Sequence, residues 1–139
     1  MLERTFCMIK PDALGRGLES EIKQRILQAG FIVIVEQRLK LSSELAEKLY
    51  AVHKGKKFYA GLVEFITSSE VDLMVLEAEN AIDKLRGLMG ATDPRAAEPG
   101  TIRCDLKEID IFTKDGIIKN LVHGSDSEEN AKYEMGIFF

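Results

Sequence analysis

The sequence has only two cysteines, Cys7 and Cys104, and they lie far apart in the chain. Neither a disulfide framework nor a zinc site is therefore expected, and Cys7 fits a small core residue. No apolar run approaches the ~20 residues that a membrane-spanning helix needs. Residues Met1 to Arg4 also lack the charged-then-apolar pattern of a signal peptide. These absences predict a cytoplasmic protein with no membrane segment.

The chain also lacks a positive net charge. Its 19 lysines and arginines against 23 aspartates and glutamates leave −4, so no global basic field is present to attract nucleic acid. The basic turn Lys54-Gly55-Lys56-Lys57 is a local exception, and dedicated nucleic-acid binding is not expected. The composition, 45% apolar and 30% charged, is that of an ordinary globular protein, and the length fits a single domain spanning residues 1–139.

The usual nucleotide-binding motifs are absent as well. The chain has no G-x-x-x-x-G-K-[ST] phosphate loop. The segment Gly15-Arg-Gly17-Leu-Glu-Ser20 resembles a dinucleotide-binding fingerprint, but Ser20 stands where the third glycine belongs and no doubly wound parallel sheet is expected. Any phosphate chemistry must therefore depend on side chains.

Short apolar runs and helix-like patterns alternate along the chain. Strands are expected at residues 5–9, 31–38, 71–76 and 135–139. Helices are expected to begin near Ser20, Ser42, Phe58 and Asn80, with a brief one after Ser127. Two β-α-β halves in one small domain predict an α/β sandwich of the ferredoxin-like type, in which helices cover one face of a four-stranded antiparallel sheet.

Residues 91–119 carry loop signals instead, among them Pro94, Pro99 and Gly116. A loop of this length inside a compact domain is usually functional. Within it, Ile109-Asp-Ile-Phe112 is either a small strand or a local packing element. The sequence therefore predicts a long loop directly before the segment that holds the first candidate for chemistry.

That segment reads Asn120-Leu-Val-His123-Gly-Ser-Asp-Ser127. It places one of only two histidines at a tight junction between a short apolar run and a helix start. Imidazole titrates near pH ~6.5, so at neutral pH the ring is mostly uncharged and its lone pair can attack phosphorus. A lone histidine in a turn more often has no catalytic role, so the rest of the chain decides between these interpretations.

Candidate phosphate-binding groups lie at separate places. Lys10 follows the first strand, Arg86 lies in a predicted helix, and Arg103 lies in the long loop. The planar guanidinium suits phosphate oxygens, and Thr92 adds a hydroxyl donor. Phe58, beside the basic turn, could stack on a base. Taken singly, such cations are more often surface charges, and such an aromatic ring is more often part of the core.

Together these segments resemble the nucleoside diphosphate kinase family. The resemblance covers nearly the whole chain in the right order, and the histidine segment and the Lys-Pro-Asp element are its most specific parts. The segments that carry it are Met8-Ile-Lys10-Pro-Asp12, Tyr50 and Phe58 around the basic turn, Gly61-Leu62-Val63, Leu88-Met-Gly-Ala-Thr92-Asp-Pro94, Pro99-Gly-Thr-Ile-Arg103, and Asn120 to Ser127.

The resemblance implies transfer of a γ-phosphoryl group from a nucleoside triphosphate, with ATP as the expected donor, to a nucleoside diphosphate. The implied route is ping-pong, through a phosphohistidine on His123, with Ser125 and Glu134 orienting the imidazole. The residues implied to hold phosphates and ribose are Lys10, Tyr50, Arg86, Thr92, Arg103 and Asn120, with Phe58 stacking on the base and Leu62 lining the pocket beside it.

The resemblance also implies Mg²⁺, brought mainly by the nucleotide phosphates, with Asp126 as a contact through water. Relatives assemble as tetramers or hexamers built from dimers, so a homo-oligomer is expected. The connection 106–119 is several residues longer than is usual in the family, and Ile117 is the nearest candidate for the residue that covers the base. A non-catalytic nucleotide-binding module on the same scaffold is the alternative, and the presence of the histidine and its supporting residues disfavours it.

Overall fold

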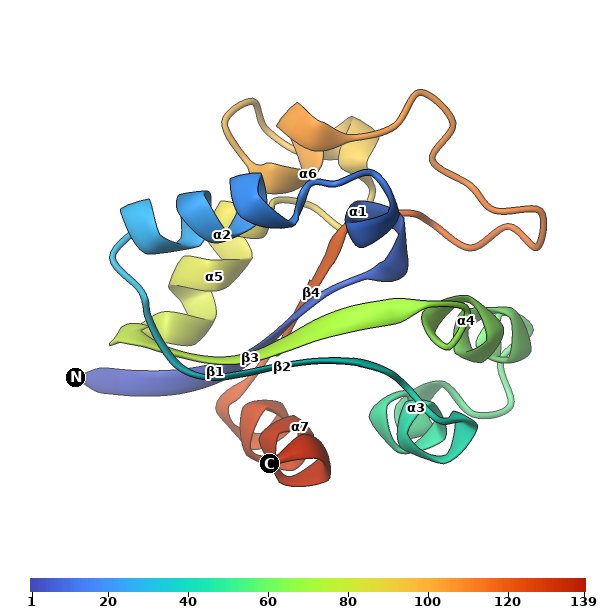
Figure 1. Ribbon diagram of the computed structural model, residues 1–139, viewed down its shortest axis with the longest axis horizontal. Helices are drawn as coiled ribbons and strands as arrows, with labels where there is room; N and C mark the ends of the chain where they lie inside the picture. Colours follow the sequence, from blue (N-terminus) through green and yellow to red (C-terminus); the bar gives the residue numbers. More distant parts are fainter.

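The computed structural model describes residues 1–139 and is built around one antiparallel sheet (Figure 1). Its strands are β1 (Leu2–Ile9), β2 (Ile32–Lys40), β3 (Glu70–Glu79) and β4 (Val122–Gly124), in the order β2-β3-β1-β4. The central pair, β1 and β3, runs in register from Leu2↔Glu79 to Ile9↔Asp72. This arrangement confirms the predicted ferredoxin-like sheet of four antiparallel strands.

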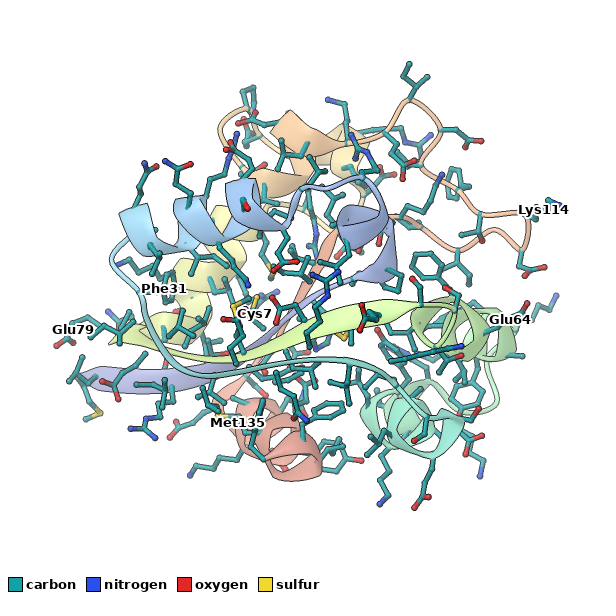
Figure 2. All side chains as sticks on the ribbon, in the orientation of Figure 1. Cys7, Phe31, Glu64, Glu79, Lys114 and Met135 are labelled. Atoms are coloured by element: carbon teal, nitrogen blue, oxygen red, sulfur yellow. The ribbon has the colours of Figure 1, made fainter.

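Helices cover both faces of the sheet. On one face, α2 (Glu19–Gln28) and α5 (Ala81–Met89) enclose a core that includes Cys7 and Ile9. On the other, α3 (Ser43–Leu49), α4 (Tyr59–Ile66) and α7 (Glu128–Phe138) pack on Phe6 and Met8. Figure 2 shows the result, with Phe31 and Met135 on opposite sides of the sheet.

The prediction that helices cover one face was therefore too narrow. Successive side chains of a strand point to opposite faces, and β1 from Phe6 to Ile9 is apolar at every position and fully buried. Both faces of the sheet need apolar cover for that reason. The outer strand β2 differs, because its side chains Ile32, Ile34 and Val35 remain partly exposed along the sheet edge.

Most predicted helices are confirmed, and capping side chains explain where several begin. Ser42 Oγ accepts from the Leu45 amide at 3.2 Å at the start of α3, and Ser127 Oγ accepts from the Asn130 amide at 3.1 Å at the start of α7. One further helical turn, α1 (Pro11–Gly15), replaces the expected loop. Proline suits the first position of a helix because its missing N–H has no partner there in any helix.

The expected last strand at 135–139 is wrong. Ser127 and the acidic first turn start a helix, and that helix continues to Phe138 because Ala131, Met135 and Phe138 recur at helical spacing toward the sheet. Phe138 stacks on Phe6 with ring centroids 5.1 Å apart. The fourth strand is the apolar run before it, Val122–Gly124, so His123 lies on a strand and not in a turn.

Residues 91–119 are mostly irregular, as predicted, but hold two short helical turns, η2 (Pro94–Ala96) and α6 (Ile102–Leu106). A third such turn, η1 (Ala51–His53), follows α3. Within the segment Ile109–Phe112, Ile111 is buried and Phe112 forms an isolated bridge with Ile118. None of the helices combines the length and apolar character needed to span a bilayer.

Candidate active site

His123 is fixed on β4 by one carboxylate. Its Nε2 lies 3.0 Å from Glu134 Oε1, and Ser125 Oγ donates to the same oxygen at 2.6 Å. Because a carboxylate only accepts hydrogen bonds, the ring proton belongs on Nε2 and the free lone pair on Nδ1. The rings of Phe6 and Tyr50 pack edge-on against the imidazole, with centroids 5.8 and 6.3 Å away. The histidine is thus held in one tautomer and one orientation.

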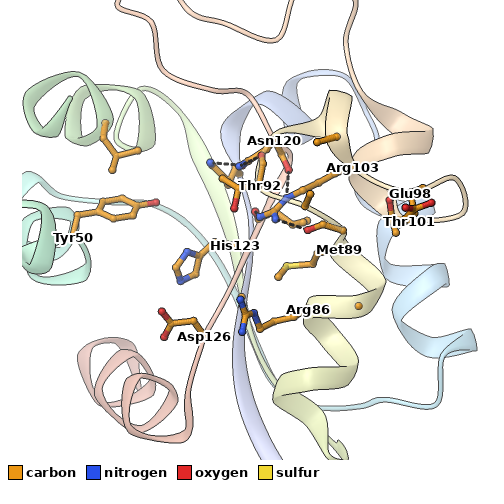
Figure 3. Close-up of a pocket in the computed structure, with 18 of the residues that line it drawn as sticks. Tyr50, Arg86, Met89, Thr92, Glu98, Thr101, Arg103, Asn120, His123 and Asp126 are labelled. Carbon is orange, nitrogen blue, oxygen red and sulfur yellow. Dashed lines mark hydrogen bonds between the residues drawn. The ribbon is translucent and has the colours of Figure 1, made fainter. Parts of the chain in front are cut away.

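His123 opens onto a cavity of about 770 Å³ between α5, the loop after it and the end of α3 (Figure 3). Of the residues predicted for the site, Lys10, Tyr50, Leu62, Arg86, Thr92, Arg103, Asn120, His123 and Asp126 line this cavity. Ser125 and Glu134 are buried and do not line the cavity; Glu134 contacts the imidazole, and Ser125 contacts Glu134. Segments more than a hundred residues apart therefore meet at one cavity.

Lys10 is buried at the end of β1 and has no carboxylate partner. Its Nζ donates to Asn120 Oδ1 at 2.8 Å, and Asn120 Nδ2 in turn donates to the Thr92 carbonyl at 3.0 Å. Burial lowers the pKa of Lys10 to about 8, against the opposing effect of Asp12. A buried ammonium with one neutral partner is poorly neutralised, which makes it a ready contact for an anionic group.

Arg103 donates to three backbone carbonyls. Its Nε, Nη1 and Nη2 donate to the carbonyls of Asn120, Gly90 and Val122 at 3.1, 2.9 and 2.7 Å. Burial lowers its pKa to about 10. A guanidinium has five N–H donors, so two remain for a ligand. Arg103 is the predicted phosphate contact, and it also ties the end of α5 to β4.

The residue between Asn120 and Val122 has a strained backbone. Leu121 has a φ of +75°, and the Val122 amide donates to the Asn120 carbonyl at 2.8 Å across it. This is the uncommon, strained form of a three-residue turn, which costs about 1–3 kcal/mol in a residue other than glycine. The Leu121 side chain is fully buried in the core, so glycine could occupy the position only by leaving a void.

One wall of the cavity is aromatic. Tyr50 is buried beside His123, and Leu62 lines the cavity from α4. Phe58 lies outside the lining and is partly exposed, with its ring edge-on to His53 at 5.1 Å. His53 also lines the cavity and was not predicted as a site residue. Its place between Tyr50 and Phe58 in the sequence was the available signal.

Two charged side chains of the cavity lining lie beside His123, Arg86 from α5 and Asp126 after β4 (Figure 3). A hydrogen bond from Asn130 holds the pKa of Asp126 below its usual range, and Arg86 adds to the effect. Asp126 is therefore an anion at neutral pH. Together with Glu98 it gives the lining only two carboxylates, fewer than a protein-built magnesium cage uses.

Close packing of α5 on β4 depends on a glycine. A Cβ atom at Gly124 would lie 2.7 Å from Met89 Cε and 3.0 Å from Leu85 Cδ2. A side chain at the position directly after His123 would therefore force the ends of Met89 and Leu85 to shift. This contact sets Arg86, one turn before Gly90, at the same edge as the histidine.

The long connection before β4 lies against α4. Ile117 is buried, and its Cδ1 would be 3.2 Å from a Cβ at Gly61. Gly61 precedes Leu62, so the connection reaches the side of the cavity where the aromatic wall lies. Ile117 does not line the cavity itself, and its proposed contact with a base stays a prediction.

The comparisons with known proteins agree with the family that the sequence resembles. The family model described as nucleoside diphosphate kinase matches residues 3–139. A curated relative from Campylobacter hominis, named nucleoside diphosphate kinase, is 47% identical over 138 residues, covering 99% of this chain and 96% of its own. One from Methanocaldococcus jannaschii, with the same name, is 45% identical over 139 residues and covers 100% and 94%.

Solved structures agree in fold. A halophilic nucleoside diphosphate kinase from Halobacterium salinarum in complex with CDP has a TM-score of 0.90 at 41% identity, covering 100% of this chain and 88% of that one. A transition-state mimic of the kinase from Borrelia burgdorferi, with bound vanadate and ADP, has a TM-score of 0.90 at 32% identity, covering 99% and 87%.

Proposed function

This chain belongs to the nucleoside diphosphate kinase family, and on that premise we propose that His123 is the residue that carries the phosphoryl group. The enzyme is a nucleoside-diphosphate kinase, which moves the γ-phosphoryl group of a nucleoside triphosphate to a nucleoside diphosphate. Membership of the family does not by itself assign a role to each residue of this chain. The geometry of the site supports a specific assignment.

The observation that carries the proposal is the hydrogen bond from His123 Nε2 to Glu134. It leaves Nδ1 unprotonated on a ring that opens onto the cavity. In the first half-reaction the Nδ1 lone pair attacks the γ-phosphorus, the N–P bond forms, and the bond to the bridging oxygen breaks with its electrons going to the departing diphosphate. The ring becomes cationic, and the Glu134 carboxylate at 3.0 Å stabilises that charge.

The second half-reaction is the reverse of the first with a different nucleoside diphosphate. Its terminal oxygen attacks the phosphorus on His123, and the imidazole leaves as the neutral ring. No proton needs to be transferred to or from the phosphoryl group in either step. The same cavity therefore serves donor and acceptor in turn, which is the ping-pong route.

The cations around His123 are proposed to neutralise the phosphates. Lys10 and Arg86 face the cavity without a carboxylate ion-pair partner, and Arg103 has two N–H groups free. Thr92 and Asn120 complete the proposed phosphate and ribose contacts. Transition-state charge on phosphoryl oxygens is stabilised by such fixed donors, each worth about a hundredfold or more in rate.

The proposed base site is the aromatic wall. Phe58, just outside the lining, would stack on the base, with Leu62 beside it, and Tyr50 would contact the phosphates or ribose. No side chain with a strong preference for one base edge is assigned there. Stacking without edge contacts accepts any base, because every base has a π-face. Broad acceptance of nucleosides is therefore expected.

A divalent cation is known to accompany phosphoryl transfer in this family, and we propose Mg²⁺ bound chiefly by the nucleotide. The lining offers Asp126 and Glu98 but no third carboxylate, which fits an ion that arrives with the phosphates. Asp126 would contact it through water. When bound, Mg²⁺ would reduce the negative charge on the phosphate oxygens.

We also propose a homo-oligomer built from dimers, either tetramer or hexamer, in the cytoplasm. The free edge of β2 supports the dimer, since it leaves Ile32, Ile34 and Val35 partly exposed beside unpaired backbone groups. Light scattering after size-exclusion chromatography distinguishes the assemblies, and cell fractionation tests the location.

The role of His123 is tested by labelling the protein with γ-labelled ATP and Mg²⁺, followed by a chase with GDP. We expect acid-labile, alkali-stable label that transfers to GDP. His53 is the only other histidine, which makes His53→Ala the matched control: it should still take up label, whereas His123→Ala should take up none. Label retained by His123→Ala would refute the assignment.

A further inference from the structure

Asp12 lies next to the proposed phosphate-binding lysine but has no role in the mechanism above. Its Oδ2 accepts from the Leu121 amide at 2.9 Å. Its Oδ1 is buried and has no hydrogen-bond partner. Burial of this carboxylate is costly, and the nearby Lys10 ammonium and the bond from the Leu121 amide offset that cost.

The amide that Asp12 holds belongs to the strained turn. Leu121 is the residue with a φ of +75°. Its carbonyl accepts from the Lys10 amide at 2.9 Å, so both backbone groups of Leu121 are bound by the Lys10–Asp12 segment. A strained turn persists only where its surroundings over-determine it. Here the Asp12 carboxylate is the side chain that supplies one of the two clamping bonds.

Three site residues depend on this turn. Asn120, directly before it, accepts from Lys10 Nζ at 2.8 Å, and Val122, directly after it, accepts from Arg103 at 2.7 Å. His123 is the next residue and pairs with Met8 of β1. Release of the Leu121 amide would let the turn relax and would move Asn120 and His123 relative to Lys10.

We propose that Asp12 is a positioning residue for the phosphoryl transfer, which acts through the Leu121 turn on Asn120 and His123 and through its negative charge on the Lys10 ammonium. The proposal rests on the function assigned above to His123. It deepens that function by naming the group that keeps nucleophile and cation in register.

The charge part of the proposal concerns a small set of groups. Asp12 and Arg103 are the charges that act on Lys10, Asp12 favouring the ammonium and Arg103 opposing it. Around Asp12 itself lie Lys10, Arg103, Tyr50 and Glu108. Burial raises the pKa of this carboxyl and Lys10 opposes that rise. Without the charge of Asp12, Lys10 would have only the neutral Asn120 oxygen as a polar partner and would lose its proton at lower pH.

Two substitutions separate the two effects. Asp12→Asn keeps an oxygen that accepts from the Leu121 amide but removes the charge, whereas Asp12→Ala removes both. Asp110→Ala is the matched control, because Asp110 also accepts from a backbone amide, that of Phe112 at 3.1 Å, in an exposed loop. Measurements are kcat and KM with ATP and GDP, the pH profile of kcat/KM, a thermal melt, and label uptake on His123.

We expect Asp12→Ala to lower kcat about a hundredfold with a cooperative melt retained, since a displacement of roughly 1 Å costs that much. Asp12→Asn should approach the turnover of the wild type only below about pH 6, because the alkaline limb of kcat/KM should move down by about one pH unit. Asp110→Ala should change neither quantity.

The proposal is overturned if Asp12→Ala has the kcat of the wild type, or if its loss disappears once rates are expressed per folded molecule. If Asp12→Ala does not fold, the alkaline limb of Asp12→Asn decides alone, and an unshifted limb overturns the proposal. Label uptake by His123 in the wild-type protein tests the proposed function independently of the Asp12 variants. Absence of that label refutes the proposed function, whereas its presence with unaltered Asp12 variants refutes only the role of Asp12.

Discussion

Two lysines in this molecule have opposite surroundings. Lys10, at the end of β1, is buried with one neutral side-chain partner, Asn120 Oδ1. Lys23, on α2, contacts three carboxylates at once: Asp72 and Glu19 at 2.8 Å, and Glu36. Burial lowers the pKa of Lys10 to about 8. Burial acts in the same direction on Lys23, but its carboxylate partners raise the pKa above the ordinary value.

This difference in surroundings determines whether each lysine stabilises the fold or can bind a ligand. The charge of Lys23 is used within the protein, where it ties α2 to β2 and β3 across the fully buried Asp72. The charge of Lys10 is left largely unneutralised and faces the cavity, so an incoming phosphate completes its surroundings. Three carboxylates around Lys23 have the spacing of a metal site, but the ammonium already occupies their centre.

The largest effect is expected from Lys10→Met, which removes the unpaired charge. Phosphoryl transfer should fall about a hundredfold to a thousandfold, because a fixed donor to the transition state is lost. The melting temperature should change little, since removal of a poorly partnered buried ammonium is offset by loss of the cation next to buried Asp12. Steady-state kinetics and a thermal melt check both. Near-normal turnover would remove Lys10 from the mechanism.

Lys23→Met should give the reverse pattern. It leaves Asp72 buried without its cation, and removal of one partner from such a pair costs about 3 kcal/mol. Turnover per folded molecule should be unchanged, because the cluster lies outside the cavity. Denaturant unfolding measures the loss. Lys48→Met is the control: its pair with Glu44 is exposed at 3.6 Å and should matter little. An equal loss in both variants would contradict the comparison.

The sequence made the Lys10 region predictable because its signals are local. A proline directly after an apolar strand, and a histidine beside glycine and capping serines, are short patterns that few alternative local structures produce. The first three predicted strands and the predicted helices through α5 are confirmed, and these segments meet at one cavity. The resemblance to the family, and no single local pattern, indicated that these segments belong to one site.

What could not be predicted depends on contacts between distant residues. β4 has only three residues, too few to display a period, so the apolar chain end was assigned as a strand in its place. The three carbonyl groups that Arg103 binds are part of the backbone, so no residue type in the sequence identifies them as its partners. Lys23 and Asp72 are 49 positions apart and read as ordinary surface charges until β3 places the aspartate under α2.

The smallest expected effect is a pH dependence of stability from the Lys23 region. Burial, and then the hydrogen bond with Glu36, raises the pKa of Asp72 from 3.8 to about 6, so the native state takes up this proton more readily than the unfolded chain. From this group alone, the free energy of unfolding should fall as pH rises from about 4.5 to about 6, by on the order of 1 kcal/mol.

Glu36 does not cancel this slope within that window. A hydrogen bond with Asp72 lowers its pKa below 4.5, so its own contribution is lost only at more acidic pH. Asp72→Asn should therefore flatten the unfolding free energy between pH 4.5 and 6 while leaving the alkaline limb of kcat/KM, set by Lys10, where it was. Urea unfolding at closely spaced pH values measures the first and kinetics the second. A variant that moved both would show that the two lysine regions are coupled, and the contrast between them would then be one of degree.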